Sequence, residues 1–488
     1  MPPALVTTPS TPDLGARNAD LKVFFDAMAL THDLWRRRHR LYYDEQSALL
    51  QRLVDPGLKV LEIGCGTGDT LAALRPSEGV GVDLSPAMLE RARQKHPRLR
   101  FVEADAEALD LGGETFDVVV LADLVGELRD LWAAFRALRG VVHERTRVII
   151  TYINYLWEPA LELAQVLGLK RPQMLQNWFS LEDIDNLLAL NGFETVSAGD
   201  GLLCPLPVPV VAPLANRLGA ALPGVRQLNL LQYLVARPGP GFNAKPKPLS
   251  CSVLIPAKNE RGNIRPAIQR TPKMGPRTEI IFVEGGSQDG TREEILRAIE
   301  DEPSPCELRF VAQPGHGKGD AVRAGFAAAS GDVFMILDAD LTVMPEDLPR
   351  FYLALAEGRG EFINGCRLVY QQEDQAMRLL NLMANKFFGA AFSYVLNQRL
   401  KDTLCGTKVL RRDAYQRIDD NRHLFGDFDP FGDFDLLFGA SHLGLRIVEI
   451  PVRYKARTYG ATQINRFRNG MTLFHMLGVA IQHFKLKR

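Results

Sequence analysis

One short apolar run that ends in two carboxylates constrains the fold of this chain more than any other feature. Val333 to Leu337 has the pattern of a buried strand in an α/β sheet, and it stops at Asp338-Ala339-Asp340. Pro345 and the two acidic residues after it are typical of the first turn of a helix. Ligands bind at the carboxyl ends of strands in open α/β sheets, so Asp338 and Asp340 could hold Mg²⁺ or Mn²⁺ carrying a diphosphate. A solvated turn that caps the next helix is the simpler interpretation of these residues alone.

The length of the chain calls for more than one hydrophobic core. At about 150 residues per domain, 488 residues predict two or three domains. The formal net charge is zero, which argues against a nucleic-acid-binding protein because such domains normally carry a basic excess. The six cysteines form no CxxC pair, which favours free thiols in a reducing compartment over a zinc site or a disulfide framework.

No segment has the pattern of a signal peptide or a membrane-spanning helix. Residues 1–20 lack a basic region followed by an apolar core, and we expect them to form a flexible tail. The longest apolar stretch, Leu202 to Ala215, is broken by four prolines, so a spanning helix is not predicted. Its proline-rich part predicts an extended lid or packing arm, with membrane contact as the alternative. These patterns favour a cytoplasmic location.

The first half contains a glycine-rich loop between a strand and a helix. Val60 to Ile63 is predicted as a buried strand, Gly64 to Gly68 as the loop and Asp69 as the start of the helix. Glycines let the backbone approach a ligand at the helix N-terminus. The spacing is GxGxG, whereas a dinucleotide fingerprint would place a glycine at position 69.

This loop, with Glu62 before it, resembles motif I of class I S-adenosylmethionine-dependent methyltransferases. The following strands fit the resemblance, since they end in Asp83, in Asp105-Ala106 and in Asp123-Leu124. The resemblance implies a Rossmann-like domain in which Glu62 contacts the methionine moiety, Asp83 the ribose and Asp105-Ala106 the adenine. The residues that carry over are Glu62, Gly64, Gly66, Asp83, Asp105 and Ala106.

The methyl acceptor cannot be read from the sequence. Methyl transfer needs the sulfonium and the nucleophile aligned, and it needs a base only if the acceptor must lose a proton. The possible bases are His143, Glu127, Tyr42 and Tyr43, although a histidine before a strand is typical of a surface residue and tyrosines at helical spacing are typical of a core. The alternative is a binding module that keeps the fold without methylating. Later in this half, Ser180 and Asp183 predict a capping box at a helix start.

A linker divides the chain. Residues 237–248 combine proline, glycine and basic residues without apolar periodicity. We therefore expect a methyltransferase domain over 21–236, a second domain over 249–470 and an amphipathic basic segment over 471–488. In the second domain, strands and helices alternate from Cys251 to the run that ends at Asp338, which predicts a parallel sheet with helices on both faces.

Four motifs in order, PAKNE, VEGGSQDGT, GKGDAVRAGF and LDADL, resemble family 2 inverting glycosyltransferases of the GT-A fold. Within that family the similarity is to dolichyl-phosphate or polyprenyl-phosphate sugar synthases. The resemblance implies a nucleoside-diphosphate sugar donor, a polyprenyl-phosphate acceptor, and Mg²⁺ or Mn²⁺ held by Asp338 and Asp340. It places Lys318 near the phosphates, and it lines the nucleotide pocket with Pro256, Ala257, Glu260 and Glu284.

Two positions depart from the family pattern. Glu284-Gly285 stands where Asp-Asp is common, which affects the contact to the base, and Thr342 stands where a glutamine is common, which affects a third metal contact.

The acceptor side of this second domain leaves two interpretations open. The family resemblance directs Arg367 towards a lipid phosphate, with Lys408 assisting, and such an acceptor needs no strong base because it is already an anion at pH 7. A glycan or soluble hydroxyl acceptor would need a carboxylate base, for which Asp435 is the candidate and Asp433 the neighbour that could be confused with it. Capping of a helix start competes with this role for both.

Two segments could meet a membrane surface. An apolar helical face is predicted from Phe387 to Leu396, with basic residues on both sides, and the segment from Met471 is apolar with a basic tail. Both lengths suit an interfacial helix better than a spanning one. Core packing is the alternative for both, and peripheral association with the cytoplasmic face of a membrane is the expectation.

Overall fold

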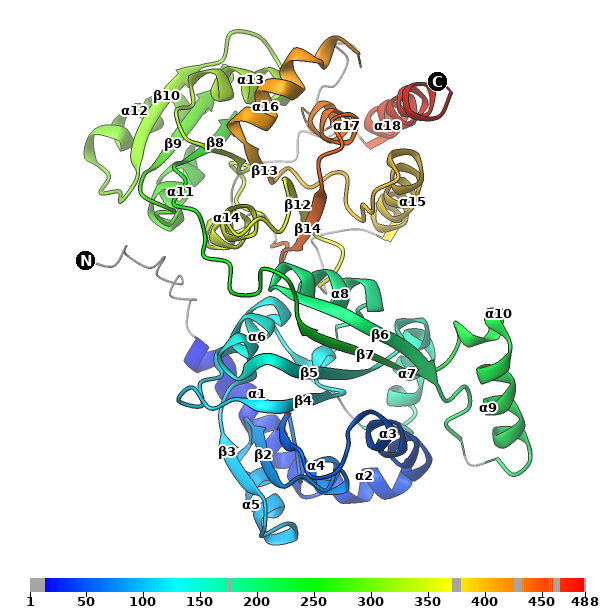
Figure 1. Ribbon diagram of the computed structural model, residues 1–488. Coiled ribbons are helices and arrows are strands. Elements are labelled where there is room, and N and C mark those ends of the chain that lie inside the picture. The colour runs from blue at the N-terminus through cyan, green and yellow to red at the C-terminus, as the bar shows by residue number, and fades with distance from the viewer. Residues whose placement is uncertain are drawn as a thin grey trace. The chain divides into compact units, whose positions relative to one another are not determined.

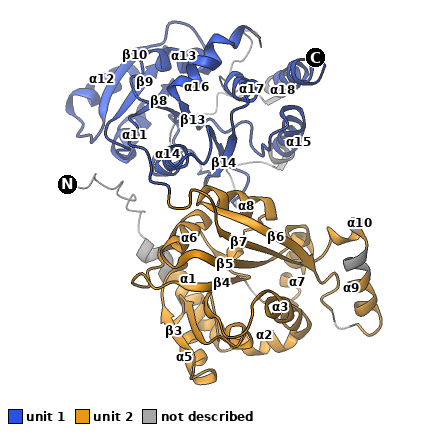
Figure 2. Ribbon diagram, viewed as in Figure 1, with its two compact units in different colours: residues 1–11, 244–488 blue, residues 12–243 orange. Residues whose placement is uncertain are grey.

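The computed structural model describes residues 14–171, 173, 177–206, 208–370, 379–424, 432, 434–455, 457, 459 and 466–486. The chain forms two compact units, and the boundary between them lies after Asn243, inside the predicted linker (Figure 2). In the order of the chain, we call residues 12–243 (unit 2 in the figure) the first unit and residues 244–488 (in unit 1 of the figure) the second unit. Helix α1 (Leu14–Ala29) starts within the segment that was expected to be a tail.

The first unit is built on one seven-stranded sheet with the strand order β3-β2-β1-β4-β5-β7-β6 (Figure 1). Its strands are β1 (Lys59–Ile63), β2 (Glu78–Asp83), β3 (Arg100–Glu103), β4 (Phe116–Ala122), β5 (Val142–Ile153), β6 (Phe193–Gly201) and β7 (Leu231–Pro238). The first five run parallel, and β7 runs antiparallel to both β5 and β6. The carboxyl ends of β1, β2, β3 and β4 therefore meet at one edge, which is where the predicted cofactor residues fall.

Helices complete this unit. Those before the sheet are α1, α2 (His32–Arg38) and α3 (Arg40–Leu53), and those within it are α4 (Asp69–Ala73), α5 (Pro86–Lys95), α6 (Leu131–Ala137), α7 (Glu158–Val166), α8 (Leu181–Leu190), α9 (Val211–Ala221) and α10 (Pro223–Arg226). The predicted capping box forms at the start of α8, because Asp183 N–H donates to Ser180 Oγ and Ser180 N–H donates to the Asp183 carboxylate.

The second unit has its own seven-stranded sheet, in the order β10-β9-β8-β11-β13-β12-β14. The strands are β8 (Cys251–Ala257), β9 (Thr278–Glu284), β10 (Glu307–Ala312), β11 (Val333–Ile336), β12 (Phe362–Cys366), β13 (Lys408–Arg411) and β14 (Ile447–Pro451). The parallel sheet predicted from Cys251 to Asp338 is confirmed, since β10, β9, β8 and β11 pair in parallel. The later strand β13, on which no prediction was made, runs antiparallel to β11 and β12. Strand and helix alternation indicates element type, whereas the direction of a short inserted strand depends on how the chain returns to the sheet.

The helices of the second unit are α11 (Ile264–Arg270), α12 (Thr291–Asp301), α13 (Lys318–Ala328), α14 (Leu348–Ala356), α15 (Leu379–Leu396), α16 (Arg412–Asp420), α17 (Phe434–His442) and α18 (Arg466–Ile481). The apolar face of α15, for which membrane contact and core packing were both open, packs mainly in the core, where Phe388, Phe392 and Val395 are buried. Core packing was the competing interpretation, and the periodicity of the helix does not distinguish the two environments.

Part of α15 stays apolar and exposed, and it includes Phe387 from the predicted face. Phe387 is 53% exposed and Tyr394 74% exposed, and Phe474 of α18, which contacts Phe387, is 59% exposed. In the part of the chain that the structure describes, no helix combines the length and apolar character needed to traverse a bilayer.

Candidate active sites

A pocket lies at the carboxyl edge of the first sheet. All six residues predicted to bind S-adenosylmethionine line it, together with residues from α2 and α3 that no sequence motif indicated. The helical residues that the argument below uses are His32, Arg36, Tyr43 and Gln46. Because they come from helices far from the glycine loop in sequence, only the packing of α2 and α3 against the sheet edge brings them to the pocket.

The glycine loop is shaped by its own backbone and by Asp83. Gly64 has φ of 74° and Gly66 φ of 50°, a region that favours glycine, and a Cβ on Gly64 would meet Leu124 at 2.7 Å. Gly66 N–H donates to one Asp83 carboxylate oxygen at 2.8 Å, and Ser85 N–H donates to the other at 2.9 Å. Burial raises the pKa of Asp83. The loop is thus fastened to the end of β2, with a buried acid at the position that the resemblance assigns to ribose.

Glu62 and Arg36 place a carboxyl group and a guanidinium in the same pocket. Leu71 N–H, in the first turn of α4, donates to Glu62 Oε2 at 2.9 Å, and burial raises the pKa of Glu62 to about 8, with Arg36 acting in the opposite direction. The Arg36 guanidinium carbon lies 4.3 Å from the centroid of the Tyr43 ring. A buried carboxyl group and a guanidinium suit a ligand that carries both an ammonium and a carboxylate, as an amino-acid group does.

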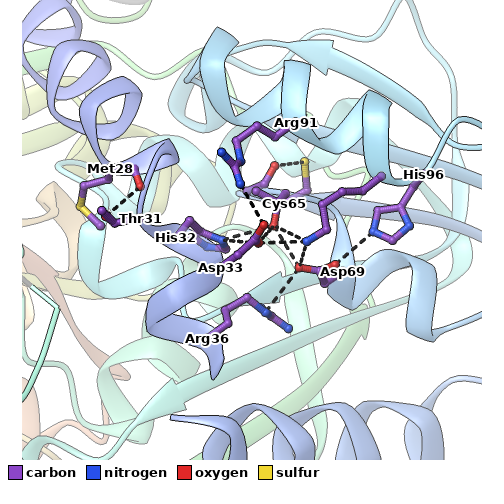
Figure 3. A network of polar contacts seen from close by, with 12 residues as sticks. Met28, Thr31, His32, Asp33, Arg36, Cys65, Asp69, Arg91 and His96 are labelled. Atoms are coloured by element: carbon purple, nitrogen blue, oxygen red, sulfur yellow. Dashed lines mark hydrogen bonds and ion pairs between the residues drawn. The ribbon is translucent and has the colours of Figure 1, made fainter. Parts of the chain in front are cut away.

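A polar network holds α2 over the glycine loop (Figure 3). Lys95 Nζ lies 3.0 Å from Asp33 and 2.6 Å from Asp69, so it joins α2 to the start of α4. Thr67 Oγ1 lies 3.2 Å from His32 Nδ1, and burial lowers the pKa of His32 to about 4. His32 is therefore neutral at pH 7, and the network fixes the helix that carries Arg36.

Asp123 marks the other end of the pocket. It has φ of 56°, which is uncommon for a residue other than glycine and is typical of functional sites. Tyr42 Oη and Gln46 Nε2 each donate to its carboxylate at 2.8 Å, and burial raises its pKa to about 6. Nearby, the pocket residues Glu127 and Arg171 form an ion pair of 2.6 Å.

The four candidate bases thus separate in space. Tyr43 and Glu127 line the pocket, Tyr42 contacts Asp123, and His143 lies 3.6 Å from Asp117 at the start of β5, away from the pocket lining.

The second site lies where β8, β9 and β11 end. Lys318 Nζ, at the start of α13, lies 2.6 Å from Asp338 Oδ1, and Arg457 Nη2 lies 2.6 Å from Asp340 Oδ2. Burial raises the pKa of Asp338, and the Lys318 ammonium more than offsets this, so the pKa lies below its usual value. Thr342 Oγ1 donates to Asp340 Oδ1 at 2.8 Å. The threonine that stands where the family commonly has glutamine therefore hydrogen-bonds to one of the two acids.

The predicted nucleotide residues surround these acids. Arg457 also reaches Glu260, at 3.3 Å, and burial raises the pKa of Glu260. Glu284 is buried and accepts from Ser287 N–H at 2.5 Å. Pro256 and Ala257 end β8 in register with the last two residues of β9. Sequence reasoning missed Arg457, because it is 117 residues from Asp340 and belongs to no motif that we identified.

Arg367 and Lys408 are held differently. Arg367 Nε and Nη2 bind the two carboxylate oxygens of Asp402 at 2.7 and 2.8 Å, so the guanidinium is fixed by a buried bidentate pair. Lys408 is fully buried, and its ammonium donates to Asn364 Oδ1 at 3.0 Å and to the Cys405 carbonyl. This burial favours a structural role for Lys408 over a contact with the acceptor.

Asp435 lies in the first turn of α17. Arg422 Nε donates to its Oδ2 at 3.1 Å, and Arg323 lies 4.0 Å from the same oxygen. Asp433 lies outside the described residues. The role of Asp435 as a base for a hydroxyl acceptor stays a prediction.

The donor set at Asp338 and Asp340 determines which metal chemistry fits. Within the described ranges, no three His, Cys, Asp or Glu side chains converge as a ready ligand set. Two carboxylates fit an ion such as Mg²⁺, which takes its remaining oxygen ligands from a diphosphate and water. Such an ion would replace Lys318 and Arg457 as the partner of the two acids.

Two separate stretches of the chain match family models. Residues 34–198 match the family model described as "Methyltransferase domain", and residues 252–419 match "Glycosyl transferase family 2".

Curated relatives include an undecaprenyl-phosphate 4-deoxy-4-formamido-L-arabinose transferase of Serratia proteamaculans. It is 31% identical over 216 residues, covering 43% of this chain and 61% of the relative. A protein of the same description from Pseudomonas syringae pv. syringae is 33% identical over 159 residues, covering 30% and 46%. The chain thus spans less than two thirds of the length of these relatives.

Solved structures similar to this chain include a possible histamine N-methyltransferase of Thermotoga maritima, at 19% identity and a TM-score of 0.37. That match covers 44% of this chain and 99% of the other. The magnesium protoporphyrin IX methyltransferase of Synechocystis PCC 6803, solved with bound S-adenosylhomocysteine, gives 19% identity and a TM-score of 0.32 over 45% of this chain and 98% of the other.

Proposed function

Because the chain joins a methyltransferase domain to a family 2 glycosyltransferase domain, we propose that it glycosylates a polyprenyl phosphate and methylates a second acceptor. The sugar comes from a nucleoside-diphosphate sugar. The relatives named as undecaprenyl-phosphate sugar transferases support the lipid acceptor. The observation that carries the proposal is the pair of adjacent acids at the end of β11, each held by a cation, Asp338 by Lys318 and Asp340 by Arg457.

The proposed glycosyl transfer is an inverting, metal-dependent displacement. An oxygen of the lipid phosphate attacks the anomeric carbon, the bond from that carbon to the diphosphate oxygen breaks, and the nucleoside diphosphate leaves with the electron pair. Asp338 and Asp340 would hold Mg²⁺ or Mn²⁺, which when bound stabilises the negative charge of the leaving group. Lys318 moves from Asp338 to the diphosphate, and Arg367, fixed by Asp402, faces the acceptor phosphate.

The proposed methyl transfer uses the pocket of the first unit. Glu62 and Arg36 take the ammonium and carboxylate of S-adenosylmethionine, Asp83 the ribose, and Asp105 and Ala106 the adenine. The cofactor, when bound, supplies the electrophilic methyl group. Asp123 is the residue best placed to accept a proton from a hydroxyl or amine acceptor, because Tyr42 and Gln46 orient its carboxylate and its pKa is about 6.

The location that fits this function is the cytoplasmic face of a membrane, where polyprenyl phosphate resides. The exposed apolar pair Phe387 and Phe474, together with Tyr394, provides aromatic side chains suited to a bilayer interface. The Lys485 ammonium lies 4.8 Å from the centroid of the Tyr394 ring, which adds positive charge to this surface. We therefore infer peripheral association through α15 and α18.

Transfer of radiolabelled sugar into an organic-extractable lipid tests the glycosyl transfer. The purified chain is incubated with polyprenyl phosphate, a panel of UDP- and GDP-sugars, and Mg²⁺ or Mn²⁺, with Asp340→Asn as the control. Label that enters the lipid phase and requires both the metal and Asp340 is the expected result. No label with any donor would refute the lipid acceptor and move attention to a hydroxyl acceptor and Asp435.

Calorimetry with S-adenosylhomocysteine tests the cofactor site, with Gly66→Arg as the control. The expected result is binding by the chain and none by the variant. No binding by the chain would show that the first unit has the methyltransferase fold but does not bind the cofactor.

A further inference from the structure

An apolar surface of the first unit takes part in neither site. It is formed by α7 with the turn after it, and by an arm of residues 206–228 that contains α9 and α10. On α7 and its turn the apolar side chains Leu163, Val166 and Leu167 are all at least 60% exposed, and Val210 on the arm is 78% exposed. Large apolar side chains exposed in number on neighbouring elements mark an interaction site.

Hydrogen bonds join the two parts of this surface. Trp157 Nε1, just before α7, donates to the Leu228 carbonyl at 2.8 Å, and Asn154 Nδ2 donates to the carbonyls of Gln227 and Asn229 at 2.9 Å each. Figure 1 shows α9 and α10 beyond the ends of β6 and β7, on the side of the sheet where α7 is labelled. These bonds fasten the end of the arm to the segment before α7, and we call the exposed apolar side chains of the arm and of α7 together the docking surface.

The docking surface is connected to the acceptor end of the methyltransferase pocket. Leu161, on the inner side of α7, belongs to the apolar cluster that includes Tyr43, whose side chain lines the pocket. In the turn after α7, the Leu169 carbonyl lies 3.0 Å from His39 Nε2 at the start of α3. Two residues later Arg171 reaches Glu127 in the pocket. A partner bound to the docking surface would thus lie next to the side of the pocket that is proposed to take the methyl acceptor.

The charge of the docking surface indicates what covers it. Residues 202–228 contain no aspartate or glutamate, and their charged residues are Arg217, which is exposed, and Arg226, which pairs with Asp200 of β6 at 3.0 Å. The acids of the surface itself are Glu158 and Glu162 on α7. Apolar side chains on an arm that carries an exposed arginine and no acid suit the interface of a bilayer that contains anionic lipids.

We propose that the docking surface inserts shallowly into an anionic bilayer and presents the methyltransferase pocket to an acceptor carried by a lipid. This inference rests on the proposed function, because it gives the methyl acceptor the same membrane-borne character as the glycosyl acceptor. It adds a second membrane contact to the one inferred for α15 and α18.

Hydrogen exchange of the full chain, with and without vesicles, tests the proposal. The vesicles contain phosphatidylethanolamine and phosphatidylglycerol, and vesicles of phosphatidylcholine alone are the neutral comparison. Slower exchange in peptides covering 163–169 and 206–217, only with the anionic vesicles, is the expected result. Unchanged exchange there overturns the proposal, whether or not the vesicles protect α15 and α18.

A matched pair of variants sharpens the test. Val211→Glu with Leu214→Glu places charges on exposed positions of α9, and glutamate at the first residue of a helix is compatible with its dipole. Both side chains would be buried in the bilayer on binding, and their loss predicts at least about tenfold weaker vesicle binding. Val196→Glu changes an exposed valine on β6 outside the docking surface and should bind as the parent chain does.

Equal effects of both changes would overturn the assignment of the docking surface. Slower exchange in the same peptides on raising protein concentration without vesicles would overturn it in favour of a contact between two copies. Sugar transfer measured on the same samples separates the two claims, since retained transfer with an unprotected docking surface refutes this inference alone.

Discussion

The Lys318 ammonium lies 2.6 Å from a carboxylate oxygen of Asp338, at the point where β11 ends and α13 begins. The carboxylate is partly buried, so its charge depends on this cation more than that of a fully exposed acid would. The same lysine is proposed to meet the diphosphate of the donor. The ion pair therefore keeps Asp338 ionised until a metal ion binds the carboxylate and the diphosphate of the donor binds Lys318.

Lys318→Met should shift the acid limb of the pH–activity profile of sugar transfer to higher pH. Burial raises the pKa of Asp338 and Lys318 is the largest influence that lowers it, so without the ammonium the pKa rises and the carboxylate is protonated at a higher pH as the medium is acidified. Affinity for the nucleotide sugar should also fall. Lys273→Met removes an exposed lysine of the same unit and should leave both quantities unchanged. An unshifted acid limb in Lys318→Met would contradict the role given to the pair.

Gly406→Ala should abolish sugar transfer while the second unit stays folded. A Cβ at this position would overlap the Asp338 carboxylate and the Lys318 ammonium, so the methyl group forces the pair apart. Gly478→Ala is the matched control, because a Cβ there meets no atom within 4 Å. Circular dichroism checks the fold and the lipid-extraction assay checks activity. Full activity of Gly406→Ala would show that the pair tolerates displacement.

Arg36→Met should weaken S-adenosylhomocysteine binding roughly 10- to 100-fold, the range expected for a lost hydrogen bond to a charged group. Methylthioadenosine lacks the amino-acid group, so its affinity should not change. Titration calorimetry with both ligands measures the difference. Equal losses for the two ligands would mean that Arg36 supports the pocket without contacting the amino-acid group.

Binding of S-adenosylhomocysteine at pH 7 should release a proton. Burial raises the pKa of Glu62 to about 8, so the free carboxyl group is mostly protonated at pH 7. A ligand ammonium beside it favours the ionised form and lowers this pKa, and the proton leaves. Calorimetry in buffers of different ionisation enthalpy counts the proton, and Glu62→Gln should eliminate it. Release that persists in the variant would assign the proton to another group.

Asp402→Asn should destabilise the second unit by about 3–5 kcal/mol, because it leaves the buried Arg367 guanidinium without its counter-charge. Asp44→Asn breaks an exposed pair with Arg40 and should change stability by no more than about 0.5 kcal/mol. Urea unfolding followed by hydrogen exchange assigns each transition to its unit. A small effect of Asp402→Asn would indicate that water or another acid replaces the lost carboxylate.

The sequence by itself determined the two folds and the strand ends that carry their chemistry. Glycine spacing around Gly64 and Gly66, and the stop of an apolar run at Asp338, are local patterns, because strand period and turn conformation depend on neighbours along the chain. The match of each half to its family model confirms both fold classes. Parallel strands then bring these ends to one edge without further information.

Only the tertiary structure decided which partners these residues have. Arg457 reaches Asp340, Arg36 enters the pocket of Glu62, and Asp402 holds Arg367, although no local pattern links the members of each pair. The same limit applies to Phe388, for which the sequence left a membrane surface and the core both open and which packs in the core. Helical periodicity shows that a face is apolar, but what covers it, like the partner of a charged side chain, depends on elements brought together by packing across the chain.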